Sequence, residues 1–286
     1  MKRVISVLAL GPVLVALTAP AAAQTAYSVD RDTDDLYEID LSTGNATSLG
    51  ATGFNNIEAL AFDPTGKVLY GVDEDNGELL KCDLADGSCA AVGSTGLSDA
   101  DDTGLGFTCD GRLWMVAVIG LAYQLHEVDP TTGNASLVGD LDQNLSSLAI
   151  RRGDSICPSG VFGLDESNPD LWCVDLSTGA LSLIGATDDL SSNGDPAIEF
   201  DGAGVLWAIE DNDSPPGIFT INPATGADTY TGNDLPSNEF ESLAIPSLPQ
   251  LCGGPLAIPA ASGWGLSALA FLLVAAGVLI LRRSVA

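Results

Sequence analysis

The stretch IDLSTGNATSLG, residues 39–50, decides the fold because it recurs along the chain. The other copies are CDLADGSCAAVG (82–93), VDPTTGNASLVG (128–139), VDLSTGALSLIG (174–185) and INPATGADTYTG (221–232). Each copy carries a turn glycine six residues before its final glycine, and the copies are spaced by 43 to 47 residues. A period of this length is typical of the blades of a β-propeller.

Two further series of short segments run in step with the first. One begins with an aromatic residue, as in AYSVD, LYGVD, LWMVA, VFGLD and LWAIE, and the other reads EALAFD, TGLGFT, SSLAI, PAIEF and ESLAI. These segments are apolar or β-branched and bounded by Gly, Asp, Asn and Ser, which indicates strands throughout. Each blade is therefore predicted to hold four strands, ordered outward from the LAFD type to the aromatic-led type, the IDLSTG type and the TSLG type.

The ends of the repeat region predict how the ring closes. Four complete copies begin at Glu58, Thr103, Ser146 and Pro196. Residues 27–50 supply three strands without an innermost one, and residues 241–245 supply an innermost strand alone. Joining these parts completes a fifth blade and leaves no open edge. We predict an all-β, five-bladed β-propeller over residues 24–246.

The phrases LAFDxxGxLYGVD and xIDxxTG…LG resemble those of bacterial YVTN/YncE-like propellers, over residues 26–245. The resemblance implies the propeller fold. Relatives of this type are mostly non-enzymatic or uncharacterised, so the resemblance indicates the fold much better than the function.

Both ends of the chain read as export and anchoring segments. Residues 1–23 combine Lys2 and Arg3, an apolar run and a small-residue cleavage site, as a signal peptide does. Residues 265–281 are uncharged and apolar and precede the basic tail 282–286, which predicts a transmembrane helix with a cytoplasmic end.

The linker at 247–264 ends in a motif that resembles the IPTL-CTERM sorting signal. The matching residues are Ile258, Pro259, Ser262, Trp264 and Gly265. The resemblance implies an exosortase-type sorting enzyme as a partner. We expect an exported chain, anchored in the inner membrane with its propeller in the periplasm and then sorted to the surface or released. A plain membrane anchor is the alternative.

The net charge of the chain limits the classes of molecule that it can bind. The chain has 39 acidic and ten basic residues, for a net charge of −29, and every acid lies between the two apolar ends. Such a charge repels nucleic acid and attracts cations. The acids recur in loops expected on one face, and Lys67, Arg112, Arg151 and Arg152 in loops expected on the other. We therefore expect a non-enzymatic binding protein that presents an acidic face to an extracellular protein, a glycan or a cation.

Calcium is the cation that the loop acids suit. Asp30, Asp32 and Asp34 alternate along one loop, and Asp73 and Asp75 along another. Carboxylates are the hard oxygen ligands that Ca²⁺ takes, so these five residues are candidate calcium ligands and Ca²⁺ a candidate cofactor. The alternative interpretation is that aspartate here forms turns and keeps the surface soluble.

Enzymatic chemistry has little support in the sequence. The one histidine, His126, aligns with strand residues such as Tyr37 and Leu80, and no GxSxG motif occurs, so a Ser-His-Asp triad is not expected. The alternative function is a carboxylate-dependent glycosidase or lyase, with Glu58 and Glu241 on adjacent blades near the axis.

Six cysteines in an exported chain predict disulfides. Cys82 and Cys89 flank a turn and are expected to face one another across two strands. Cys109 and Cys157 are expected in neighbouring loops of the less acidic face, where they could pair, which leaves Cys173 with Cys252.

Overall fold

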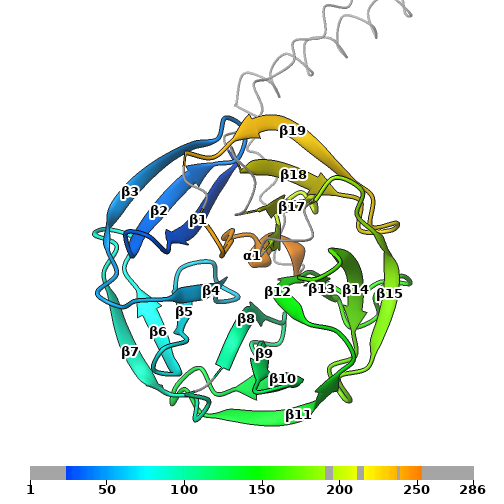
Figure 1. The fold of residues 1–286 in the computed structure, drawn as a ribbon, viewed down its shortest axis with the longest axis horizontal. Coiled ribbons are helices and arrows are strands. Elements are labelled where there is room, and N and C mark those ends of the chain that lie inside the picture. The colour runs from blue at the N-terminus through cyan, green and yellow to red at the C-terminus, as the bar shows by residue number, and fades with distance from the viewer. Residues whose placement is uncertain (1–23, 99, 191–195, 211–215, 237–238, 253–286) are drawn as a thin grey trace, which may run out of the picture.

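The computed structural model describes residues 24–98, 100–190, 196–210, 216–236 and 239–252, in which the strands form five antiparallel sheets around a central axis (Figure 1). The first sheet holds β1 (Thr25–Asp30), β2 (Asp35–Asp40) and β3 (Asn45–Ala51). The other four hold, in order from the axis outward, β4 (Ile57–Phe62), β5 (Leu69–Asp73), β6 (Glu78–Cys82) and β7 (Cys89–Ser94); β8 (Ala100–Phe107), β9 (Leu113–Ile119), β10 (Ala122–Val128) and β11 (Ala135–Leu141); β12 (Leu145–Ile150), β13 (Val161–Asp165), β14 (Asp170–Val174) and β15 (Leu181–Ala186); and β16 (Ala197–Phe200), β17 (Leu206–Ile209), β18 (Gly217–Ile221) and β19 (Asp228–Asp234). The predicted five-bladed propeller is confirmed.

The ring closes where it was expected to close. Tyr27 in β1 and Ala244 exchange two backbone hydrogen bonds of 2.9 Å. Farther along the strand Asp30 forms an antiparallel bridge with Phe240, and the Arg31 amide donates to the Glu239 carbonyl oxygen at 3.0 Å. The Ser242 hydroxyl accepts a further bond of 3.1 Å from the Val29 amide. The segment near the C-terminus therefore supplies the innermost strand of the first blade.

The aromatic-led strands explain how neighbouring blades pack. Tyr27 lies 5.5 Å, centroid to centroid, from Phe62 of the next blade. Phe162 makes the equivalent contact with Phe200 at 5.2 Å. Both pairs are edge-to-face and buried, the geometry that aromatic rings prefer. Each aromatic residue thus covers the innermost strand of the blade that follows it.

The repeated glycines also act between blades. In the third blade the Asp129 carboxylate accepts the Thr131 amide at 2.8 Å, and Gly133 then turns the chain with a φ of +84°. A Cβ on Gly133 would lie closer than 3.0 Å to the carbonyl oxygen of Gly93 in β7. Gly87 meets Gly50 in the same way, so the turn glycine of one blade packs on the final glycine of the blade before it.

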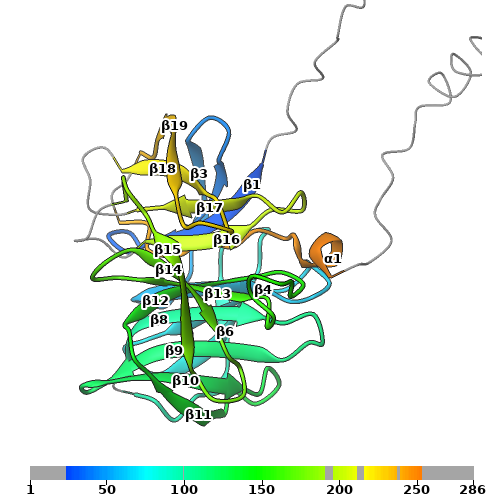
Figure 2. The same cartoon turned by 90° about the vertical axis from the view of Figure 1, so that its right-hand side faces the viewer.

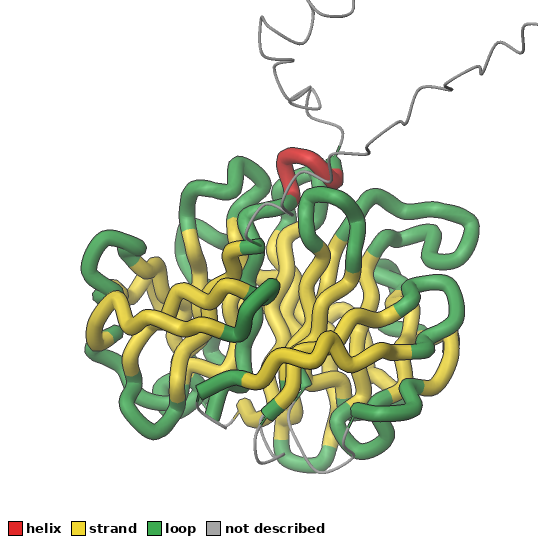
Figure 3. Tube along the Cα trace, turned by 90° about the horizontal axis from the view of Figure 1, so that it is seen from above, coloured by secondary structure: helices red, strands yellow, loops and turns green. Residues whose placement is uncertain are grey.

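The C-terminal segment crosses the axis on the face that carries the STG turns. Its short helix α1 (Leu248–Leu251) lies near the centre of the ring in Figure 1 and on the side where the described chain ends in Figure 3. The Ser247 hydroxyl donates to the Phe200 carbonyl oxygen, and Cys252 forms a disulfide with Cys109. This segment covers one end of the central channel, and the start of β1 lies on the same side (Figure 2).

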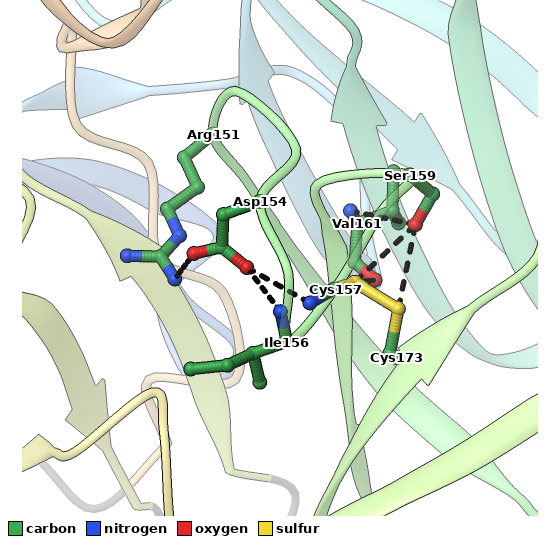
Figure 4. The surroundings of a disulfide bond; sticks show 7 residues. All are labelled: Arg151, Asp154, Ile156, Cys157, Ser159, Val161 and Cys173. Carbon is green, nitrogen blue, oxygen red and sulfur yellow. Dashed lines mark hydrogen bonds and ion pairs between the residues drawn. A yellow bond between two sulfur atoms is a disulfide. The ribbon is translucent and has the colours of Figure 1, made fainter.

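The disulfides confirm one predicted pair and correct two. Cys82 and Cys89 are bonded, as expected for opposite positions of β6 and β7. The predicted Cys109–Cys157 and Cys173–Cys252 pairs are wrong. Cys157 bonds Cys173 because the loop before β13 folds back on its own blade beside β14 (Figure 4). Cys109 forms a disulfide with Cys252, because the C-terminal segment crosses the axis and places Cys252 beside Cys109.

The signal peptide, the sorting motif with Ile258 to Gly265, and the helix at 265–281 lie outside the described residues. Among the helices that the structure does describe, none combines the length and the hydropathy that a membrane span requires.

Candidate functional site

In the first four blades, tight turns join the second and third strands on one face of the ring. We call this the acidic face and define it by Asp30, Arg31, Glu58, Glu74, Asp102, Asn144, Asp165, Glu166 and Glu241. Asp30 and Asp165 end β1 and β13 and are 4% and 2% exposed. Asp30 accepts the Asp32 and Thr33 amides at 3.0 and 3.2 Å, and Asp165 accepts the Ser167 amide at 2.8 Å. Burial raises the pKa of Asp165.

The calcium ligands predicted from these loops do not come together as a formed site. Asp30 is occupied by its own turn, and Asp73 likewise accepts the Asn76 side chain at 2.8 Å. Asp32 is exposed, and Asp34 holds a φ of +56°. No group of three or more His, Cys, Asp or Glu residues within the described ranges could hold a metal ion. The loop acids serve their turns, and calcium binding by them stays a prediction.

The residue after each of these aspartates extends to the mouth of the central channel. Arg31 contacts Glu241 at 2.6 Å and Glu58 at 3.9 Å. Glu74, in the next blade, accepts the Thr103 amide at 2.8 Å. Glu58 and Glu241 do lie near the axis on adjacent blades, as predicted, and the guanidinium of Arg31 joins them.

The channel itself is nearly filled. Side chains of the innermost strands leave a cavity of about 10 Å³, which holds about one water molecule. Its polar lining consists of Glu58, Thr103, Ser146, Ser147, Glu241 and Ser242. A larger ligand would therefore lie across the mouth of the channel.

Glu74 is the titratable group of the site that is poised near neutral pH. It is 3% exposed, and burial raises the pKa of its carboxyl to about 7. The hydrogen bonds that Glu74 makes with Glu58 and Thr103 oppose this rise, and the negative charge of Asp101 adds to it. Two buried carboxyls thus share one site, and Glu74 can donate a proton at neutral pH.

Glu199 is a second buried carboxyl, on the innermost strand β16. It is 5% exposed and accepts the Phe200 amide at 2.7 Å. Burial raises its pKa to about 8. The side chain is therefore neutral at pH 7, within the wall of the propeller.

His126 occupies the blade-packing position that was predicted for it. It is 3% exposed in β10, opposite Leu137 of β11, and burial lowers its pKa. Since it is the one histidine of the chain, a Ser-His-Asp triad is excluded.

Charge is sorted between the faces less fully than the sequence indicated. Lys67, Arg112 and Arg151 do follow the ends of innermost strands on the face opposite the acidic one. The repeated turns add carboxylates there, however, including Asp40, which accepts the Ser42 amide at 2.9 Å. Both faces carry acids. Most of the buried carboxyls lie on the acidic face, although Asp201 and Asp228 are buried on the opposite one.

Comparison with known proteins bears on the fold. No protein-family model matches the chain, and no curated protein sequence matches it. Among solved structures, a chain of the nidogen/laminin complex is 13% identical, with a TM-score of 0.52, and the alignment covers 78% of this chain and 81% of that one. The likeness shows the fold alone: a β-propeller.

Two other matched structures have lower TM-scores. One is described as regucalcin, a calcium-binding protein from Agrobacterium tumefaciens; it is 16% identical, with a TM-score of 0.47, over 78% of this chain and 74% of that one. The other is described as a putative gluconolactonase; it is 13% identical, with a TM-score of 0.47, over 78% and 82%. They assign no site residue here.

The expectation of a non-enzymatic protein is contradicted. The propellers matched to this chain include the one described as a putative gluconolactonase, a name that denotes an enzyme. Glu58 and Glu241 could be named from the sequence as candidate site residues, whereas Glu74 and Arg31 were not predicted. Their shared position after the strand-ending aspartate was the available signal.

Proposed function

We propose that the chain is a carboxylate-dependent hydrolase that acts on neutral glycans at the mouth of its central channel. The observation that carries the proposal is Glu74, a buried carboxyl with a pKa of about 7 beside Glu58. A general acid works best when its pKa lies near the working pH. The acidic face would bind the glycan, so glycan binding predicted from the sequence becomes the first step of the reaction.

In the proposed reaction one carboxyl donates a proton and another acts as a negatively charged carboxylate. Glu74 would donate its proton to the oxygen that leaves the broken C–O bond. A neighbouring carboxylate, Glu58 or Glu241, would take a proton from the water that forms the new C–O bond. Arg31, which contacts both carboxylates, would hold them in place and compensate their charge.

Electrostatics favours hydrolysis over elimination. A lyase of this kind removes a proton next to a carboxylate of an acidic sugar, and a net charge of −29 repels such a substrate. Neutral sugars carry no such penalty. Because the channel holds about one water molecule, the glycan would lie across its mouth.

The test is the release of reducing sugar from a panel of neutral polysaccharides and aryl glycosides by the disulfide-bonded chain. Glu74→Gln should lower turnover by about 10²–10⁴-fold, and Glu58→Gln should also lower it. Asp86→Asn changes an exposed carboxylate on the opposite face and should leave turnover unchanged. Absence of turnover on the whole panel, or full turnover by Glu74→Gln, would overturn the proposal.

We propose further that the chain is exported and held at the cell envelope, where an exosortase-type enzyme processes its tail. Three disulfides suit an oxidising compartment. β1 begins, and α1 ends, on the face opposite the turns between the second and third strands (Figure 2), so a C-terminal anchor would leave the acidic face pointing away from the membrane. Intact-mass analysis of envelope protein tests the removal of both ends.

A further inference from the structure

An apolar hairpin joins β9 and β10 in the third blade, on the acidic face. Its turn consists of Gly120 and Leu121, and Gly120 has a φ of +66°, which suits the first position of a two-residue hairpin turn. The hairpin reads VIGLAY over residues 118–123 and carries no charge. The corresponding turns of the first, second and fourth blades all carry charge and read RDTD (31–34), EDNG (74–77) and ESNP (166–169). The third blade therefore places an uncharged surface among charged ones.

The tip of this hairpin is exposed. Leu121 is 101% exposed, more than any other large apolar side chain that the structure describes. Val118, Ile119 and Tyr123 are partly exposed, and the last two also pack against the hydrophobic core. This packing holds the hairpin in place while its tip remains in water. A contiguous exposed apolar surface of this kind is typical of a binding site.

The base of the hairpin lies beside the candidate site. Val118 follows the leading aromatic residue of its strand by four positions, as Glu74 does in the second blade. Val118 pairs with Asp101 of β8 and with Tyr123 of β10, and opposite residues of antiparallel strands project to the same side of the sheet. The negative charge of Asp101 acts on Glu74. Asp101, Val118 and Tyr123 thus form a row that begins beside the proposed proton donor.

We propose that Val118, Leu121 and Tyr123 form a subsite that binds one face of a neutral sugar ring beside Glu74. The inference rests on the proposed hydrolase, because it assigns the residues that recognise the substrate of that site. A sugar ring presents C–H groups on its faces and hydroxyls around its edge, so its face fits an apolar surface that contains an aromatic ring. The carboxylates at the channel mouth can accept hydrogen bonds from the hydroxyls.

The first experiment measures sugar binding without turnover, in the disulfide-bonded variant Glu74→Gln. Calorimetric titration with cellohexaose, maltohexaose, mannohexaose and xylohexaose should give a Kd of about 1 mM or lower for at least one of them. Tyr123→Ala and Leu121→Ser, each added to Glu74→Gln, should raise that Kd at least about fivefold. Tyr123→Phe should raise it less than about twofold, because the aromatic ring remains.

Tyr230→Ala and Leu183→Ser are the matched controls. Tyr230 and Leu183 are 43% and 55% exposed, on the outermost strands of the fifth and fourth blades. Both substitutions should alter the Kd less than about twofold, since distant sites act independently. Circular dichroism and the thermal midpoint establish that each variant is folded.

Kinetics with Glu74 intact separate this inference from the proposed hydrolase. Tyr123→Ala and Leu121→Ser should raise KM at least about fivefold and change kcat less than about threefold, because the subsite binds substrate and transition state alike. Sugar binding without turnover by the wild-type chain would overturn the hydrolase and support the subsite. No binding of any of the four sugars, or a Kd unchanged by both hairpin variants, would overturn the subsite. If Leu121→Ser abolishes self-association, measured by sedimentation, and leaves sugar binding unchanged, the hairpin contacts a second copy of the chain, which also overturns it.

Discussion

Replacing Gly133 by alanine tests the contact between blades on which the repeat depends. The substitution places a Cβ at a φ of +84°, which costs about 1–2 kcal/mol for any side chain. It also drives that Cβ against the Gly93 carbonyl of the preceding blade. Because backbone cannot move aside as a side chain can, we expect a further loss of about 1–3 kcal/mol.

Gly111→Ala is the matched control, in the same blade. Gly111 has a φ of +89°, but a Cβ there meets no atom within 4 Å. Urea unfolding of the disulfide-bonded protein gives both free energies, and Gly133→Ala should lose about 1–3 kcal/mol more than Gly111→Ala. The double variant Gly93→Ala/Gly133→Ala should lose less than the two single losses added, because both glycines serve one contact. Equal losses for Gly133→Ala and Gly111→Ala would refute the reasoning.

Three further predictions follow from single contacts. The disulfide between Cys109 and Cys252 links residues that are 143 positions apart in the sequence. The double variant Cys109→Ser/Cys252→Ser should lower the free energy of unfolding, measured in urea, by about 2–5 kcal/mol. No change would mean that the C-terminal segment does not stabilise the ring. Burial raises the pKa of Glu199 to about 8, so the folded chain keeps a proton that the unfolded chain loses above about pH 4.5, and stability should fall between about pH 5 and pH 8. Glu199→Gln should flatten that fall, and an unchanged slope would contradict the assignment. Arg31→Met should cost about 1–2 kcal/mol at pH 7, measured in urea, since Arg31 is half exposed and forms ion pairs with the buried Glu58 and Glu241; no loss would show that these ion pairs do not stabilise the ring.

The fold could be predicted because its determinants recur five times. The turn glycines and the leading aromatic residues recur at equivalent positions of the blades, and both contact a neighbouring blade, as at Gly133 and Tyr27. The period of the sequence repeat was therefore enough to predict the propeller fold. Ring closure followed from the two incomplete copies.

The candidate site could be predicted only in part because it depends on contacts between blades. Arg31, Glu74 and Glu166 share one position but differ in chemistry, so they form no recurring pattern. The raised pKa of Glu74 comes from burial beside Glu58 and Thr103, which belong to separate turns of the chain. Cys252 lies beyond the last repeat, so the repeat could not place it.

The central claim is that Glu74 carries a proton at neutral pH, and carbon-13 NMR titration of its side-chain carboxyl tests it most directly. Wild-type protein with labelled glutamate should show a carboxyl resonance that titrates near pH 7 and that disappears in Glu74→Gln. Glu199 should titrate near pH 8 and should persist in that variant. A Glu74 resonance that titrates below about pH 5, as an exposed glutamate does, would contradict the account.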